Sequence, residues 1–146
     1  MPLQRTTHWA TRELHDFLES SATKSFQWGV HDCCLFAADA ILAMTGADIA
    51  DAFRGKYNDE ASAFSLIKSV TGGSTVAGAA EYCALQYGLE EYPFPLMAKR
   101  GDLAVVEESG RLIAGIVHLT GRHVVSVGED GLKRLCISTV QRSWAV

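Results

Sequence analysis

The spacing of apolar residues changes along the chain, and the change falls near Gly101. Before it, apolar residues recur about every three to four positions, which is typical of helices that bury one face. The pattern predicts four helices, over residues 9–22, 32–46, 59–70 and 76–87. The second has the clearest ends, because Asp32 has the short acceptor side chain of an N-cap and Gly46 suits a helix C-terminus.

Beyond Gly101 the sequence predicts strands. Short β-rich runs cover residues 103–107, 112–117, 123–127 and 132–137, and Gly-containing turn dipeptides separate them. Connections this short force neighbouring strands to be antiparallel. We therefore predict an α+β fold, with N-terminal helices packed on a C-terminal antiparallel β-meander of four or more strands. Pro93 and Pro95 predict an extended, non-helical link between the two halves.

Composition and charge narrow the classes of function. The chain has 146 residues, of which 48% are apolar and 21% charged, so we interpret residues 1–146 as a single domain. The net charge is −4 and the 13 Lys and Arg are scattered, which argues against nucleic-acid binding. We also predict no membrane span and no cofactor, since no apolar run has the length of a bilayer and no cofactor motif is present.

The N-terminus and the cysteines indicate where such a protein is made. The first eight residues lack the apolar core of a signal peptide, so we expect synthesis in a cytoplasm and no signal-peptide export. The four cysteines, Cys33, Cys34, Cys83 and Cys136, form no paired metal knuckle. We interpret them as reduced thiols, because two adjacent cysteines rarely form a disulfide with each other.

Cys33 is the candidate nucleophile. It falls in the first turn of the second predicted helix, where unpaired backbone N–H groups and the helix dipole favour an anion. Those conditions lower the pKa of a thiol and make a thiolate available near neutral pH. The alternative is an inert core cysteine, which is how we interpret Cys34, because the helix continues apolar after it.

Three short motifs resemble those of the NlpC-type peptidases, cell-wall cysteine peptidases with a papain-like fold. Trp28-Gly29 followed by Asp32-Cys33 and an apolar helix is similar to their nucleophile motif. Gly101-Asp102 is similar to the turn that opens their first strand, and Ala114-Gly115-Ile116 to the core of their second strand. The resemblance covers residues 26–128 and implies a papain-like domain with Cys33 at the nucleophile position.

A closer likeness is to small phage-encoded domains of the same superfamily. It rests on Trp28-Gly29-x-x-Asp32-Cys33, Thr45-Gly46, Arg54-Gly55-x-Tyr57 and a late Gly131-Leu132 … Trp144-Ala145. This resemblance implies a virion protein near the tip of a phage tail, or its prophage remnant, with other tail proteins as partners. It implies production in the cytoplasm of the bacterial host.

The chain departs from the active relatives at the catalytic base. The resemblance places their histidine at Ile113 and their third catalytic residue at Val125. Without a base a thiol attacks a peptide poorly. His123 shares strand parity with Val125 and is the candidate base if the register shifts; the alternative is a surface or structural histidine. Gln27 precedes Cys33 at the spacing of a papain-like oxyanion-hole glutamine, or else simply faces solvent.

Metal binding receives little support. His118 and His123 together with His31 or Cys33 supply zinc-binding residue types, but their spacing does not demand a site, so we predict no metal.

Two functions therefore stand as hypotheses. The first is a structural component of a phage tail tip with a degenerate active site, which the apolar Ile113 favours. The alternative is an active cysteine peptidase or amidase that cleaves peptidoglycan peptides with Cys33. Residues 54–57 and 92–96 carry aromatics without helical or strand periodicity, and we predict that they contact partners. For the second segment the alternative is that Phe94 and Leu96 cover the domain's own core.

Overall fold

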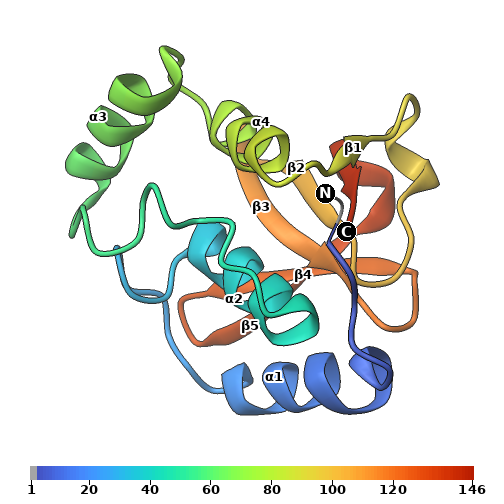
Figure 1. Cartoon of the computed structure of the whole chain (residues 1–146). Helices are drawn as coiled ribbons and strands as arrows, with labels where there is room; N and C mark the ends of the chain where they lie inside the picture. The colour runs from blue at the N-terminus through green and yellow to red at the C-terminus, as the bar shows by residue number, and fades with distance from the viewer. Residues whose placement is uncertain (1–2) are drawn as a thin grey trace.

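A computed structural model describes residues 3–146 and places the helices before the sheet (Figure 1). The helices are η1 (Trp9–Glu13, a π-helix), α1 (Leu14–Ser21), α2 (Cys33–Thr45), α3 (Glu60–Thr71) and α4 (Val76–Gln86). The α+β prediction, with helices ahead of an antiparallel meander, is confirmed. The first predicted helix begins with a π turn that continues directly into α1.

Helix α2 is the central helix, and its ends are set by the residues that the sequence indicated. The Asp32 side chain accepts a hydrogen bond from the Leu35 N–H at 2.9 Å, which caps the first turn. Gly46 ends the helix at φ 80°, a left-handed conformation that costs glycine least. Apolar residues lie all round α2, as expected of a helix enclosed by other elements.

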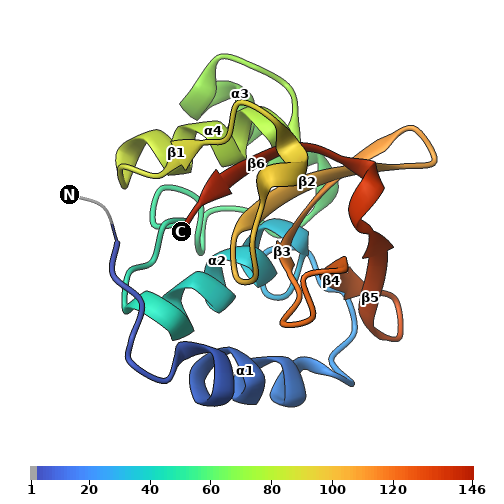
Figure 2. The same cartoon turned by 90° about the vertical axis from the view of Figure 1, so that its right-hand side faces the viewer.

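Within residues 3–146 the sheet has six strands in the order β1-β6-β2-β3-β4-β5, and every pairing is antiparallel (Figure 2). The strands are β1 (Glu90–Glu91), β2 (Leu103–Glu108), β3 (Arg111–Val117), β4 (His123–Gly128), β5 (Gly131–Cys136) and β6 (Val140–Ala145). Strands β2 to β5 form the predicted meander. Strand β6 then returns to pair with the outer edge of β2, where it separates β2 from the short β1.

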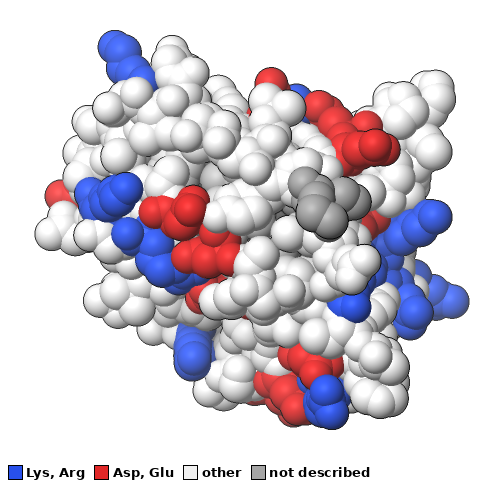
Figure 3. Space-filling model, in the orientation of Figure 1, with Lys and Arg blue, Asp and Glu red and all other residues white. Residues whose placement is uncertain are grey.

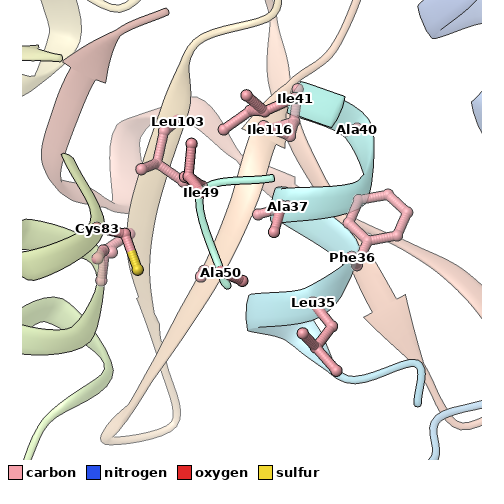
Figure 4. Packing of buried hydrophobic residues seen from close by; sticks show 14 of the residues in the cluster. Leu35, Phe36, Ala37, Ala40, Ile41, Ile49, Ala50, Cys83, Leu103 and Ile116 are labelled. Atoms are coloured by element: carbon pink, nitrogen blue, oxygen red, sulfur yellow. The ribbon is translucent and has the colours of Figure 1, made fainter. Parts of the chain in front are cut away.

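Two apolar clusters lie on opposite faces of the sheet. The larger joins α1, α2 and α4 to one face, and Figure 4 shows Ile49 and Ala50 filling the space between α4 and α2. The smaller covers the other face, with Val106, Val117 and Val124 at its centre. Helix α3 lies at the outside of the helical layer and packs mainly on α4 (Figure 1).

Two parts of the fold differ from the prediction. Pro95–Met97 forms a 3-10 turn, η2, where we expected extended chain, because proline at the first position of a helical turn loses no hydrogen bond. Strands β1 and β6 were not predicted. A second 3-10 turn, η3 (Ile137–Thr139), connects β5 to β6.

Candidate functional site

Asp32 organises the start of helix α2. Its side chain is buried, and besides capping the helix it accepts hydrogen bonds from the Gly29 N–H at 3.0 Å and from the Tyr57 hydroxyl. Gly29 has φ 79°, and a Cβ atom there would lie 2.2 Å from the Tyr57 carbonyl oxygen. The Gly29-x-x-Asp32 spacing and Tyr57 therefore belong to one arrangement, which holds the loop before Cys33 against the loop before α3.

Cys33 is the first residue of α2 and is half-buried. Hydrogen bonding from the Cys34 thiol is the largest influence on the pKa of Cys33 and lowers it, and the backbone N–H groups of Ala114 and Cys34 act in the same direction. Burial and the Asp32 carboxylate oppose this lowering. The same interaction raises the pKa of Cys34 well above its ordinary value. The thiolate is therefore favoured at Cys33 and disfavoured at Cys34.

The strand that faces Cys33 presents an apolar wall. Ala114 lies in the helix-side cluster and its backbone N–H stabilises the Cys33 thiolate. Ile113 packs instead against the cluster on the far face of the sheet. We predicted that Ile113 or its immediate neighbour would face Cys33, and the structure places the neighbour there, because side chains alternate along a strand.

His123 does not lie beside Cys33. Its ring stacks on His118 with centroids 4.3 Å apart, and its Nδ1 contacts the Thr120 hydroxyl at 3.5 Å. Strand β4 passes Ala114 at Ser126, whose hydroxyl donates to the Ala114 carbonyl at 2.7 Å. His123 precedes Ser126 by three positions, a separation of about 10 Å in extended chain. The observed register of β3 and β4 therefore keeps His123 away from the thiol.

Burial lowers the pKa of both stacked histidines. The cationic Arg134 adds to the lowering at each of them, and at His118 the nearby His123 does so too. This pair therefore favours neutral imidazole and belongs to the β3–β4 turn, away from the start of α2.

Gln27 and His31 are the other two residues considered near the nucleophile. Gln27 is exposed, and its backbone pairs with His31 in an isolated bridge. The His31 ring is buried edge-on against Phe36, and burial lowers its pKa. Within residues 3–146 no group of three His, Cys, Asp or Glu side chains is placed to hold a metal ion.

A cavity of about 420 Å³ opens beside Cys33, between α2, α3, α4 and β3. Its walls are mostly apolar, and none of the described residues that line it is a histidine. Three of the four thiols, Cys33, Cys34 and Cys83, line it. Figure 4 shows Cys83 projecting from α4 toward the space in front of α2. Burial raises the pKa of Cys83 to about 12, so this thiol stays protonated.

The cavity was not predicted, and the two loop residues considered for partner contact have structural roles. Arg54, which we considered for partner contact, binds Asp39 and Asp48 at 2.7 and 2.9 Å and anchors its own loop. The Tyr57 hydroxyl binds Asp32, as described above. The cavity itself has no sequence signal, because each helix contributes ordinary apolar positions to it.

The surface shows no face of a single sign in the view of Figure 3, where acidic and basic groups are interspersed among uncharged ones. Across residues 3–146, none of the helices combines the length and the apolar character needed to cross a membrane.

The fold and the site define an α+β domain with a thiol of lowered pKa at the start of its central helix and an apolar cavity beside it. The chain belongs to the family described as a domain of unknown function, DUF6950, which matches residues 4–146. Comparison with curated proteins and with solved structures gives no match.

Proposed function

We propose that this chain is a structural component of a phage tail tip, or of a prophage remnant, whose NlpC-type active site is degenerate. The observation that carries the proposal is the wall facing Cys33, where Ala114 lies and where none of the cavity-lining residues among 3–146 carries an imidazole. A cysteine peptidase needs a base that takes the thiol proton and later protonates the leaving amine. The start of α2 provides a nucleophile position without that base.

The fold is compatible with the NlpC resemblance. Cys33 opens a buried helix that packs on strands β3 and β4 of an antiparallel sheet, and the resemblance likewise implies a nucleophile at the start of a central helix. Fold alone does not decide between a working and a degenerate site, because the same architecture supports both. The chemistry around Cys33 therefore carries more weight than the architecture.

An exposed apolar segment supports an assembly role. Phe94 is 70% exposed, Leu96 63% and Met97 47%, and all three lie in or beside the η2 turn. They do not cover the domain's own core, which was the alternative for this segment. Large exposed apolar side chains are the kind that anchor interfaces between proteins. We place the contact with other tail proteins here.

The second candidate function is an active cysteine peptidase or amidase acting on peptidoglycan peptides. One observation favours it: the lowered pKa of Cys33, which increases the fraction of nucleophilic thiolate. In this alternative the base would have to come from outside the described site, from the substrate or from a partner protein.

Two assays on the purified chain separate the candidates. The first measures cleavage of peptidoglycan peptides by the wild type, Cys33→Ala and the control Cys136→Ala. The second measures binding to neighbouring tail proteins, with Leu96→Asp compared with Leu85→Asp, a change at another exposed leucine. We expect no cleavage, and binding that Leu96→Asp weakens and Leu85→Asp does not. Cleavage that disappears only in Cys33→Ala would establish the enzyme instead.

A further inference from the structure

The cavity beside Cys33 has the features of a site for a small apolar molecule. Its volume of about 420 Å³ falls in the range of ligand pockets, which are apolar with a few placed polar groups. Alanines from facing helices, among them Ala38, Ala63 and Ala79, line much of it, and they leave a slot where larger residues would have closed the core. Apolar cavities exclude water and accept apolar molecules.

Charge differs between the inside of the cavity and its mouth. Asp32 is buried inside it, and its hydrogen bonds come from Gly29, Leu35 and Tyr57, none of them cationic. Arg111 also lines the cavity, but its side chain is 71% exposed, so it lies at the mouth. It lies three positions before Ala114 on β3, about 10 Å away along extended strand. An anionic group is therefore repelled inside and attracted at the mouth.

The ion pair at the mouth of the cavity can be exchanged for another. Arg111 pairs with Glu60 at the start of α3 at 3.3 Å, and both side chains are exposed, so this ion pair is weak. Helix α3 carries Ala63, Phe64 and Ile67 over the cavity but packs mainly on α4. A carboxylate arriving at the mouth can thus replace Glu60 at Arg111 without breaking the core.

We propose that the cavity binds a single-chain amphiphile of the fatty-acid type, with its aliphatic chain between α2, α3 and α4 and its carboxylate at Arg111. The site does not depend on whether the domain assembles into a tail or cleaves peptides. Cys33 lies at the inner wall and contacts the chain without reacting with it.

The full chain is titrated with decanoate and with decan-1-ol to test the site. Binding is measured by calorimetry and by the shift in Tm, since a ligand that binds only the folded state raises Tm. We expect one saturable decanoate site per chain. Ala63→Leu fills the cavity and should weaken binding about tenfold or more, because it builds a clash into the site. Ala61→Leu, at an exposed position of the same helix, should leave binding unchanged.

The head group is tested at the mouth. Arg111→Gln should weaken decanoate about two- to fivefold, the size of an exposed ion pair, and leave decan-1-ol unaffected. Glu60→Gln, which frees Arg111, should strengthen decanoate. If Ala63→Leu fails to fold, Ala79→Leu on the α4 wall replaces it. Absence of saturable binding, or equal binding by the cavity-filled variant, overturns the site. A decanoate affinity that Arg111→Gln does not change overturns the proposed position of the carboxylate.

Discussion

The start of helix α2 carries a thiol, and the β3–β4 turn carries two imidazoles. A cysteine hydrolase needs these two groups side by side, but here they lie in different parts of the molecule. At the first, Cys33 has a thiol whose pKa is lowered by Cys34 and by backbone N–H groups. At the second, His118 and His123 stack on each other and have pKa values lowered mainly by burial. A lowered thiol pKa therefore does not by itself indicate a catalytic pair, because each group owes its pKa to its own surroundings.

Removing the Asp32 carboxylate is expected to have the largest effect on the thiol region. Asp32→Ala deprives the Leu35 and Gly29 N–H groups and the Tyr57 hydroxyl of their acceptor. We expect the free energy of unfolding to fall by about 2–4 kcal/mol, a lost cap together with buried donors left unpaired. Urea unfolding followed by circular dichroism measures it.

The matched control is Asp59→Ala, which removes the cap of α3 at an exposed site. It should cost only about 1 kcal/mol. Equal losses in the two variants would show that Asp32 is an ordinary cap and does not organise the site.

The next effect concerns the thiol alone. Cys34→Ala removes the largest cause of the lowered Cys33 pKa, so that pKa should rise. A higher pKa reduces the thiolate fraction at neutral pH, and we expect iodoacetamide to alkylate Cys33 more slowly. The rate is measured by mass spectrometry against pH in a Cys136→Ser background, because Cys136 is exposed and its pKa is also lowered.

Cys34→Ser serves as the conservative variant, because a hydroxyl can still donate to the sulfur of Cys33. It should retain most of the fast alkylation. If Cys34→Ala reacts as fast as the parent, the helix terminus alone determines the reactivity of Cys33.

Acid should destabilise the domain through its histidines. The pKa values of His31, His118 and His123 are lowered in the folded state from 6.5. Below about pH 6.5 the unfolded chain therefore binds more protons than the folded one, and stability falls with pH until the folded-state pKa values are passed. Urea unfolding at pH 7.5 and 5.5 measures the loss.

His31→Gln separates the contribution of the buried ring near α2 from that of the stacked pair. It should reduce the loss of stability between the two pH values, while stability above pH 7 shows only the cost of the substitution. A stability that does not change between pH 7.5 and 5.5 would contradict the lowered pKa values of all three residues.

The smallest effect is expected at His123. His123→Ala removes a half-buried ring that stacks on His118, and should change the free energy of unfolding by only about 0.5–1 kcal/mol. It should leave the alkylation rate of Cys33 unchanged across the pH range. A change in the pH dependence of that rate would show that His123 influences the Cys33 thiol, and would make His123 the candidate base again.

The sequence was most informative where one residue determines local geometry. Asp32 and Gly46 marked both ends of α2, and glycine-containing turns marked the meander, because caps and tight turns depend on a few adjacent residues. Strand β6 was missed for the opposite reason. Its residues 140–145 do not alternate regularly between apolar and polar, and their partners in β2 are some forty residues earlier in the chain.

The site was predictable only as far as the nucleophile position. Cys33 followed from the cap at Asp32, but the residue facing it depended on which side of β3 meets the helices, and a shift of one residue exchanges Ile113 for Ala114. The cavity depends on how alanines from separate helices face one another. Such a space is a property of packing and leaves no motif.

The position of β6 has a consequence for the order in which the molecule folds. Strand β6 lies between β1 and β2, and Trp144 from this strand is buried in the main core. Until residues 140–145 have been synthesised and released from the ribosome, the edge of β2 has no partner and the site of Trp144 is empty. The nascent domain therefore exposes an unpaired strand edge, which is prone to pair with other chains. Completion of the sheet depends on β6, which follows the other described strands along the chain.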